Sequence, residues 1–546
     1  MRILGISGAH DASVCVLTDG VIERFYKEER LTKKKRDKTP YKSLITVYEE
    51  FGQTIDKVVI STPTTNNFVD FGVCCKKLFG VEPEFVCQNH HLQHASLAFY
   101  HSGFDRCLTF VIDRNGSNVE NYFRESETVF HCEYPHNITE VYKTFWRIDA
   151  DDQKLFEILQ ATKRDFPHCE FICDSKFNIT KVYESATTLI SEHPLENGKT
   201  MGLSAYGKDM PFYNLFEDSI PKDKYFTHLI KDHHPEMPMA VFKEYDHKTS
   251  DGVKESNYQF YADYAFQVQK QTQEAVGDLI EKYSEKFDLK NICITGGYGL
   301  NVVANSYYKK RFPEYNFFYE PLADDTGNSI GCALLAHYKE ISSFKKVSIP
   351  DTFFHGKLHK VPEKYNHCEE DFILDSILSG KSVAVYRGLA ESGPRSLGNR
   401  SILFDCRNKD TKDIVNRIKK REWYRPFAAI CLEQDAHVLF DMIGVQKSEC
   451  MTMSFDIKNE YRELYSGIVH VDGSCRIQTI DETHHLFSLL SKVKDKTGFG
   501  ILLNTSFNLA GEPLVESIED AEKVLSNSDL DMIWFPETSQ YYDGNN

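Results

Sequence analysis

The sequence predicts an α/β protein of two domains, and three observations carry that prediction. At 546 residues the chain is too long for a single hydrophobic core. Short apolar strands alternate with helical segments along its first part, which is typical of α/β domains. Apolar periodicity then lapses over residues 342–358 and resumes beyond them. We therefore place the domain boundary near residue 349, giving domains of residues 1–348 and 349–546.

The first domain opens with two β-prone strands, residues 2–6 and 13–18, joined by a tight turn. Asp19 and Gly20 then give a strong hairpin signal before a third strand. Actin-like and Hsp70-like ATPases present a phosphate-binding hairpin in the same way. His10 lies in the first turn, where its side chain can project toward a bound nucleotide. It either accepts a proton near neutral pH or only holds its turn together with Asp11.

The alternation of strands and helices continues beyond this hairpin. Residues 57–63 and 107–113 are expected strands, and residues 89–102 an expected helix. Apolar side chains at helical spacing predict a long helix over residues 258–283. It leads into an expected strand at residues 291–295 and a glycine-rich turn. A polar segment, residues 130–180, lacks clean periodicity, so we expect an inserted subdomain there.

The composition is that of an ordinary globular protein, with 41% hydrophobic and 27% charged residues. No apolar run reaches the roughly 18 residues needed to span a bilayer, and no signal peptide is recognisable. The 15 cysteines are scattered and lack a CxxC pair, which favours reduced thiols and a cytoplasmic location. The net charge of −17 argues against wholesale wrapping of nucleic acid. The basic run at residues 31–38 is either a solvated loop or a local basic groove.

A metal site is indicated by His90 and His94, which lie four residues apart and so share one face of the expected helix. Such a pair is either structural or a ligand pair for one divalent metal. Asp113, at the end of its strand, and Asp325 would complete a His2Asp2 site with open positions, with Asp324 as the rival of Asp325. A set of imidazole and carboxylate ligands suits iron(II), written Fe(II), or manganese better than a structural zinc.

A glycine-rich turn follows the strand at residues 291–295. Glycine lets backbone N–H groups approach a phosphate or a nucleobase without a Cβ in the way. The spacing matches neither a Walker A loop nor a dinucleotide fingerprint. The turn is therefore either an ordinary strand-to-helix connection or a cofactor-binding loop formed by Gly296, Gly297, Gly299 and Asn301.

The second domain predicts an anion pocket, because several cations sit among glycine, proline and aromatic residues in an acidic protein. Arginine binds phosphate through two parallel hydrogen bonds, and lysine adds a point charge. Polyphosphate together with a second small anion would account for so many donors. The candidate residues are Arg395, Arg400, Lys419, Arg421, Arg425 and Arg476, together with Asn504, Ser506 and Asn508.

With these residues in view, nearly the whole chain resembles the O-carbamoyltransferases of nodulation-factor, cephamycin and nebramycin biosynthesis. Its motifs follow one another in the order of that family. They are GISGAHDAS, KEERLTKKKRD, NHHLQHA, ENGKTMGLSAYG, TGGYGLN, DDTGNSIG, ESGPRSLGNRSIL, KKREWYRPFA, HVDGSCRIQT and LNTSFNLAGEPLV.

The resemblance implies two domains related to the tRNA threonylcarbamoyladenosine machinery. The first, residues 1–348, would be an actin/Hsp70-like (ribonuclease H-like) domain with a metal at His90, His94, Asp113 and Asp325. The second, residues 349–546, would be a YrdC-like α/β domain that makes carbamoyl adenylate from Mg-ATP and carbamoyl phosphate. The metal-bearing domain would then transfer the carbamoyl group to an acceptor hydroxyl.

The resemblance also assigns roles to single residues. His10 matches a histidine close to the transfer site. Lys419 and Arg425 would act in adenylation. The residues that match the family's pocket for ATP and carbamoyl phosphate beside them are Arg395, Arg400, Asn504 and Ser506, and the cation clustering adds Arg421 and Arg476 as substrate-binding residues.

Two departures from the family pattern stand out. The family's QGRxEFGPRALG is RGLAESGPRSLG here, so Leu389 replaces an arginine while Arg387 takes a glutamine position. The family's DGxGE is DRNGSN here, which keeps Asp113 but loses the acid at Ser117.

The acceptor is not fixed by the sequence. It is a small sugar or natural-product alcohol, or alternatively a hydroxymethylated pyrimidine such as 5-hydroxymethylcytosine in viral DNA. The basic run and the segment at residues 130–180 keep the DNA alternative open. A tRNA threonylcarbamoylation fusion and a non-enzymatic ATP-binding scaffold fit the motif order less well. For the oligomeric state, the sequence leaves a homodimer as one alternative.

Overall fold

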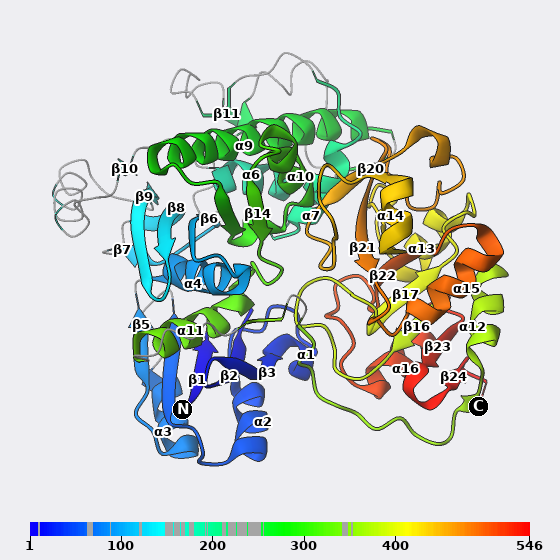
Figure 1. The fold of residues 1–546 in the computed structure, drawn as a ribbon, viewed down its shortest axis with the longest axis horizontal. Helices are drawn as coiled ribbons and strands as arrows, with labels where there is room; N and C mark the ends of the chain where they lie inside the picture. Colours follow the sequence, from blue (N-terminus) through cyan, green and yellow to red (C-terminus); the bar gives the residue numbers. More distant parts are fainter. Residues whose placement is uncertain are drawn as a thin grey trace. The chain divides into compact units, whose positions relative to one another are not determined.

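The computed structural model describes residues 1–8, 11–62, 69–87, 89–119, 123–147, 157, 164, 170–173, 179–191, 193, 195–209, 214–216, 225–226, 237–238, 253–254, 256–340, 348–350 and 353–545. This part of the chain forms two compact units (Figure 1). The first unit combines Met1–Asp56 with Ile349–Asn546, and the second is Lys57–Ser348. Among the described residues, no helix has the length and apolar character needed to cross a membrane.

The second unit ends at Ser348, and the first 56 residues group with the C-terminal part of the chain rather than with residues 57–348. Side-chain contacts explain this grouping. Arg30 donates a hydrogen bond of 3.3 Å from Nη2 to the carbonyl of Gly393, and Lys33 forms an ion pair with Asp520. The compact unit is therefore discontinuous in sequence.

The second unit begins with two parallel strands, β4 (Lys57–Thr62) and β5 (Glu84–Cys87), which flank α3 (Val69–Phe79). Its main sheet has the order β10-β9-β8-β6-β13-β14, and β7 pairs with β8. β6 and β13 pair in parallel, as do β13 and β14, whereas β6, β8 and β9 are antiparallel. The sheet strands are β6 (Arg106–Ile112), β7 (Asn118–Val119), β8 (Phe123–Glu133), β9 (Asn137–Arg147), β10 (Glu170–Cys173), β13 (Asn291–Thr295) and β14 (Asn316–Tyr319), and a separate pair joins β11 (Tyr225–Phe226) to β12 (Met237–Pro238).

The helices of this unit include the two that the sequence predicts, α4 (His90–Ser102) and α9 (Tyr258–Phe287). In Figure 1, α9 lies beside α6, α7 and α10, all of which contact it. α11 packs against α4, and α4 also contacts β6 and β13. The remaining helical elements are α6 (Ile179–Ser191), α7 (Asn197–Ser204), η3 (Gly297–Leu300), α10 (Val302–Arg311), η4 (Asp325–Gly327) and α11 (Asn328–Glu340).

The segment at residues 130–180 is in part a continuation of the main sheet. β9 pairs with β8 along its length, and β10 adds a further strand in parallel to β9. Over these described residues the segment is therefore sheet rather than a separate subdomain. Most of residues 148–169 lie outside the described residues.

The first unit opens with the predicted antiparallel meander of β1 (Arg2–Ser7), β2 (Ser13–Thr18) and β3 (Val21–Lys27). Asp19 and Gly20, which join β2 to β3, both have positive φ angles, of 50° and 88°. This conformation gives a tight hairpin turn, as the Asp-Gly pair predicts. Two short helices follow, α1 (Glu28–Thr32) and α2 (Tyr41–Phe51).

Residues beyond 353 add a ten-stranded mixed sheet with the order β15-β24-β23-β16-β17-β22-β18-β21-β20-β19 in the described chain. Its strands are β15 (Asn366–His367), β16 (Val383–Tyr386), β17 (Arg400–Phe404), β18 (Ala428–Leu432), β19 (Phe440–Asp441), β20 (Ser454–Ile457), β21 (Ser474–Ile480), β22 (Ile501–Ser506), β23 (Met532–Phe535) and β24 (Gln540–Tyr542). The helical elements around it are α12 (Glu370–Leu378), α13 (Thr411–Lys419), α14 (Glu433–Leu439), η5 (Asn459–Tyr461), α15 (Phe487–Thr497), α16 (Ile518–Ser526) and η6 (Pro536–Thr538).

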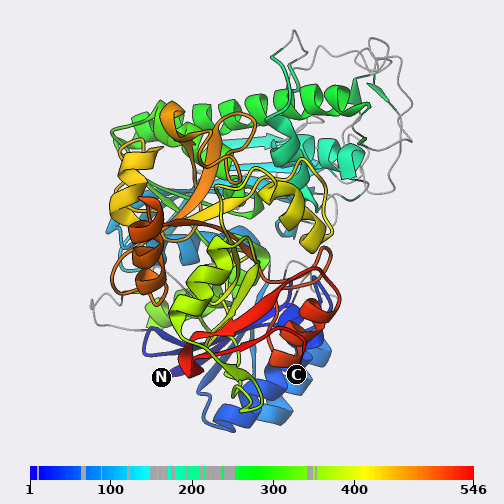
Figure 2. The ribbon, with the colours of Figure 1, turned by 90° about the vertical axis from the view of Figure 1, so that its right-hand side faces the viewer.

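Both faces of this sheet are buried, which makes it the middle layer of three. Val383 and Val385 of β16 belong to a core with residues of α12 and α15. Ala384 and Tyr386 alternate with them and belong to a second core with residues of α16. This is the period of two expected of a strand covered on both sides. Figure 2 shows these yellow-green to red segments from a second direction.

Candidate functional site

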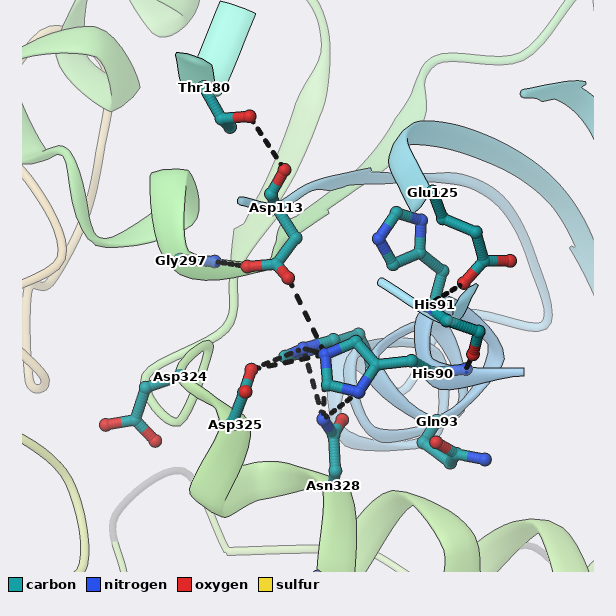
Figure 3. Close-up of polar contacts among 12 residues, drawn as sticks. His90, His91, Gln93, Asp113, Glu125, Thr180, Gly297, Asp324, Asp325 and Asn328 are labelled. Carbon is teal, nitrogen blue, oxygen red and sulfur yellow. Dashed lines mark hydrogen bonds and ion pairs between the residues drawn. The ribbon is translucent and has the colours of Figure 1, made fainter. Parts of the chain in front are cut away.

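The four predicted metal ligands meet in a buried cluster in the second unit (Figure 3). One ligand atom from each of His90, His94, Asp113 and Asp325 lies within 4.8 Å of the others. Asp325 Oδ1 is 3.2 Å from His90 Nε2 and 3.3 Å from His94 Nε2. Asp113 Oδ2 is 3.6 Å from His90 Nε2. The sequence prediction that these four residues lie together is therefore met by the geometry.

Each ligand is placed by a regular element. His90 and His94 occupy the first and second turns of α4 and so share one face. Asp113 follows β6 directly, and Asp325 begins η4. Asp324, its rival, instead accepts a hydrogen bond of 3.1 Å from the N–H of Thr326 and caps this short helix. Asp325 is thus the carboxylate that faces the histidines.

The donor set fits a divalent metal. Ligand atoms bound at about 2.1 Å in octahedral geometry lie about 3 Å apart when cis and about 4.2 Å when trans. The two Nε2 atoms of His90 and His94 are 3.3 Å apart, close to a cis spacing. Asn328, the first residue of α11, places Nδ2 3.2 Å from His94 Nε2. Two imidazoles and two carboxylates would leave two of six positions open for substrate.

The electrostatics of the cluster favour a cation. Burial lowers the pKa of His90, but the charge of Asp325 and the hydrogen bond with Asp113 outweigh burial and raise that pKa well above its usual value. At Asp113, burial favours the neutral acid, yet the hydrogen bond from His90 holds its pKa below the usual value. The two buried carboxylates therefore stabilise positive charge at this place, and they would stabilise a bound divalent ion in the same way.

The glycine-rich turn supports this cluster. Gly297 donates its N–H to Asp113 Oδ1 over 3.0 Å, as Figure 3 shows. Gly296 has a φ of +82°, and a Cβ there would lie 2.5 Å from the carbonyl oxygen of Ile112, so only glycine allows the turn to approach β6. The turn thus orients a candidate metal ligand.

The other two residues of the predicted cofactor loop make local contacts. A Cβ at Gly299 would lie 3.3 Å from that of Ala323. Asn301 caps α10 by accepting the N–H of Ala304 over 3.1 Å, and its Nδ2 donates to Gln269 over 3.0 Å. These contacts fix the start of α10, and nucleotide binding by this loop stays a prediction. The predicted catalytic His10 lies outside the described residues.

The predicted anion pocket in the first unit contains a tight group of cations. Lys419 is the last residue of α13, Arg421 and Arg425 follow it, and Arg476 lies on β21. β18 lies between β21 and β22, because Ala428 pairs with Arg476 on one side and with Asn504 on the other. The end of α13, the segment that follows it and the strand β21 therefore hold these cations, and Asn504 lies on the other side of β18.

These cations lie close enough to repel one another. Burial, and then the charges of Arg421, Arg425 and Lys35, hold the pKa of Lys419 well below its usual value. Burial and the charges of Arg425 and Arg476 do the same to the pKa of Arg421. Burial lowers the pKa of Arg476 to about 10, and Arg425 contributes. A bound anion would relieve this repulsion.

Polar groups line the same place. Lys419 Nζ donates to Asn508 Oδ1 over 2.7 Å and to Ser506 Oγ over 3.0 Å. Arg421 Nε donates to Asn416 Oδ1 over 2.8 Å, and its guanidinium stacks 4.0 Å from the Phe427 ring centroid. These contacts hold the cations in fixed positions.

Two further predicted residues differ in burial. Asn504 is buried and donates from Nδ2 to Gln478 Oε1 over 3.2 Å. Arg395 is half-buried in the loop between β16 and β17.

Arg400 makes contacts within its own loop. It is completely buried and lies 3.6 Å over the centre of the Tyr386 ring. Its Nη1 donates to the carbonyl of Arg387 over 2.6 Å and its Nη2 to that of Gly388 over 2.9 Å. Because these donors already bind carbonyl oxygens, Arg400 holds the loop after β16, and we leave it out of the proposed phosphate-binding set.

The basic run at residues 31–38 contributes to the same unit. Lys33 Nζ donates to the carbonyl of Arg30 over 2.7 Å and forms an ion pair with Asp520. Lys35 lies near enough to Lys419 to lower its pKa. Lys33 and Lys35 thus face protein groups within the unit, which differs from a fully solvated loop.

The departures at Arg387 and Leu389 face a cavity of about 960 Å³ within the first unit. Gln478 lines this cavity and also accepts a hydrogen bond from Asn504, a residue of the predicted anion pocket. His484 and His485, whose ring centroids stack 4.6 Å apart, form part of its wall. The changed motif therefore alters a cavity wall.

Three residues at or near the candidate metal cluster were not predicted from the sequence. Asn328 touches both histidines, but an asparagine after a glycine-containing turn gives no distinctive signal. Glu125 and Lys143 are buried beside α4 and come from strands that lie in or next to the poorly periodic segment. Glu125 and Lys143 are diagonal rather than facing neighbours on β8 and β9, so the cross-strand pairing of opposite charges does not point to them from the sequence.

Comparison with known proteins gives the family. The model described as carbamoyltransferase N-terminus matches residues 41–334, which is over half of the chain. The model described as carbamoyltransferase C-terminus matches residues 374–540. The two matches together include the predicted metal ligands and the predicted anion-binding cations.

The chain is also similar to individual proteins and solved structures. Uncharacterized protein MJ1058 of Methanocaldococcus jannaschii is 29% identical over 82% of this chain and 72% of its own length. Nodulation protein NolNO of Sinorhizobium fredii is 26% identical over 96% of this chain and 77% of its own length. A crystal structure of full-length HypF is 11% identical, with a TM-score of 0.38, over 63% of this chain and 56% of that chain. By the two family matches, the chain is a transferase enzyme and belongs to the carbamoyltransferase family.

Proposed function

We propose that the protein is an O-carbamoyltransferase that uses ATP and carbamoyl phosphate, through carbamoyl adenylate, to carbamoylate an acceptor hydroxyl. The observation that carries this proposal is the group of like charges formed by the buried Lys419 and the half-buried Arg421, Arg425 and Arg476. Such a group is unstable by itself, and polyphosphate is the ligand that would compensate it. The separate His2Asp2 cluster supports a second reaction step elsewhere in the chain.

In the proposed first step, the cation group binds the two anionic substrates side by side. Carbamoyl phosphate loses its phosphate to water and yields carbamate. A carbamate oxygen then attacks the α-phosphorus of ATP, the bond from that phosphorus to the pyrophosphate oxygen breaks, and pyrophosphate leaves. Arg425 and Lys419 stabilise the charge that develops on the phosphates, since fixed cations in a buried site act strongly. Arg395, Arg421 and Arg476 orient the substrates, with Asn504 and Ser506.

In the proposed second step, His90, His94, Asp113 and Asp325 hold a divalent metal, with iron(II) preferred and manganese as the alternative. When bound, such an ion acts as a Lewis acid toward a carbonyl oxygen. Gly297 fixes the carboxylate of Asp113, and Asn328 lies against both histidines. His10 accepts the proton of the acceptor hydroxyl, a task worth typically about 10²–10⁴-fold. The oxygen attacks the carbamoyl carbon, and AMP leaves.

The fold assignments of the two parts are also proposals. The main sheet of the second unit has the order β9-β8-β6-β13-β14, so β6, the first of these strands along the chain, lies in the centre. On one side β8 pairs antiparallel with β6 and β9 antiparallel with β8. On the other side β13 pairs parallel with β6 and β14 parallel with β13. This arrangement supports a ribonuclease H-like, and hence actin-like, domain. For residues 349–546, a sheet covered by helices on both faces, together with the predicted cation pocket, supports a YrdC-like domain.

A small alcohol is the acceptor that we favour. Lys33 and Lys35 of the basic run face groups of their own unit, so the run gives less reason to expect a DNA-binding groove. Labelled carbamoyl phosphate, offered with ATP and either sugars or a duplex containing 5-hydroxymethylcytosine, separates the two acceptor classes. If the label appears in the duplex, the acceptor is DNA and the proposed small alcohol is wrong.

The adenylation step is tested by pyrophosphate release. Arg425→Ala should lower release driven by ATP and carbamoyl phosphate by at least about tenfold, because a charge-assisted hydrogen bond worth about 1.5–3 kcal/mol is lost. Arg417→Ala, at an exposed position on α13, is the matched control and should release pyrophosphate like the wild type. The variant should still transfer the carbamoyl group from chemically supplied carbamoyl adenylate. Equal failure with that intermediate would show that Arg425 does not act in adenylation.

A further inference from the structure

A buried ion pair lies beside the candidate metal cluster. Glu125 on β8 and Lys143 on β9 each have side chains only 2% exposed, and Lys143 Nζ lies 2.7 Å from Glu125 Oε1. Lys143 also lies 2.5 Å from Glu140. Removing two charges from water costs several kcal/mol each, and their attraction offsets this cost only with good geometry and further hydrogen bonds. A net gain in folding stability is therefore not a sufficient explanation for this buried ion pair.

The second oxygen of Glu125 leads toward the metal cluster. Oε2 accepts the backbone N–H of Ser117 over 2.8 Å. Ser117 in turn accepts the backbone N–H of His90 on its Oγ over 2.9 Å. Lys143, Glu125 and Ser117 therefore form a continuous chain of contacts that ends on a candidate metal ligand.

The end point of this chain is the start of α4. The first N–H groups of a helix have no partner within the helix, and a capping side chain usually satisfies one of them. Asn89, the residue in the capping position here, makes no side-chain capping bond. Ser117 supplies an acceptor from a different segment instead. The helix that carries both histidine ligands is thus anchored through Ser117.

The loop before Ser117 packs directly against Glu125 at Gly116. A Cβ at Gly116 would lie 2.6 Å from Glu125 Oε2 and 2.7 Å from His91 Nε2. Gly116 also donates its own N–H to the carbonyl of Glu125 over 2.8 Å. The absence of a side chain at Gly116 allows the carboxylate to reach Ser117.

We infer that Glu125, held in place by Lys143, is a positioning residue for the metal centre, acting on His90 through Ser117. This inference rests on the proposed role of His90 as a metal ligand. It also accounts for the altered motif, in which serine replaces an acid at position 117. A carboxylate still contacts the backbone of residue 117, but it comes from β8. Interactions that orient ligands in this way typically change metal affinity by about 10–100-fold.

The test compares two double variants that both remove the buried charges. In Glu125→Gln with Lys143→Met, the amide oxygen can still accept the Ser117 N–H. In Glu125→Ala with Lys143→Met, no acceptor is left. Affinity for Mn²⁺, measured from the free-ion electron paramagnetic resonance signal, should stay within about threefold of wild type in the first and fall at least about tenfold in the second. Glu140→Gln, which changes only the other partner of Lys143, should bind Mn²⁺ like the wild type.

Equal Mn²⁺ affinity in the two double variants would overturn the inference. If the alanine variant fails to fold, Ser117→Ala removes only the Oγ acceptor and provides the same comparison, with unchanged affinity again overturning the inference. His94→Ala, measured in parallel, separates this failure from failure of the metal assignment. Wild-type affinity in His94→Ala would show that the metal is held elsewhere.

Discussion

Asp324 and Asp325 are neighbours in sequence, yet their side chains have different tasks. Asp324 caps η4 through the N–H of Thr326, whereas Asp325 lies 3.2 Å from His90. The sequence predicted one aspartate of this pair as a ligand but could not separate them on physical grounds. The direction of each side chain depends on how the short helix turns, which local spacing does not reveal.

Asp325→Asn and Asp324→Asn provide a matched test of this difference. Asparagine caps helices as well as aspartate does, so Asp324→Asn should keep its turn and bind Mn²⁺ like the wild type. Asp325→Asn removes a charged ligand, and its Mn²⁺ affinity should fall at least about tenfold. Mn²⁺ titration of both variants provides the check. The reverse order of affinities would make Asp324 the ligand.

Arg400 shows a second limit at the residue scale. It occurs in a motif dense with cations, and its charge and spacing resemble those of Arg395. In the structure its donors bind main-chain carbonyls of its own loop. Whether an arginine binds a ligand or its own backbone depends on loop conformation, which residue type cannot predict.

Among the elements, α4 and α11 make the closest helix contact near the candidate site. A Cβ at Gly331 of α11 would lie 2.1 Å from the carbonyl oxygen of Gln93 on α4. This close approach brings Asn328 to the two histidines. The packing of these two helices therefore sets part of the ligand geometry.

Gly331→Ala should push α11 away from α4. Forcing extra atoms into a packed contact costs typically about 1–3 kcal/mol, and Mn²⁺ affinity should fall with it. Gly277→Ala in α9 is the control, because its nearest neighbour is the mobile end of the Arg311 side chain, 2.5 Å away. Alanine is the better helix former by about 1 kcal/mol, so this control should unfold at wild-type urea concentrations or slightly above. Equal stability of both variants would contradict the close packing.

Elements with strong periodicity could be predicted from the sequence. α9 begins at the predicted Tyr258, β13 covers the predicted residues, and Asp113 follows β6 as expected. β9 escaped prediction because its polar side chains, among them Lys143, are buried by pairing across the sheet. Only the fold shows that Lys143 reaches the carboxylate of Glu125, which lies diagonally from it on the neighbouring strand.

At the scale of the whole molecule, the first unit carries a source of acid sensitivity away from the metal cluster. Burial, and then the charges of His484 and Arg387, lower the pKa of His485 to about 2. An unfolded histidine binds a proton below about pH 6.5, whereas the folded His485 does not. The unfolded state therefore binds more protons, and stability falls as the pH falls below that value.

His485→Gln should remove this part of the acid sensitivity. Between pH 7 and pH 5 a histidine with these properties lowers the free energy of unfolding by about 2 kcal/mol. The variant should accordingly lose about 2 kcal/mol less than the wild type over that range. Urea unfolding at both pH values measures the difference. An equal loss in both proteins would mean that folded His485 titrates normally.

The division of labour between two sites is the central claim, and His94→Ala tests it most directly. Both half-reactions are measured on one preparation, namely pyrophosphate release with carbamoyl phosphate and ATP, and transfer of the carbamoyl group to an acceptor from supplied carbamoyl adenylate. The account predicts that transfer is abolished while pyrophosphate release stays at the wild-type rate, because His94 belongs to the metal cluster of the second unit. Loss of pyrophosphate release in a folded variant, or transfer at the wild-type rate, would contradict it.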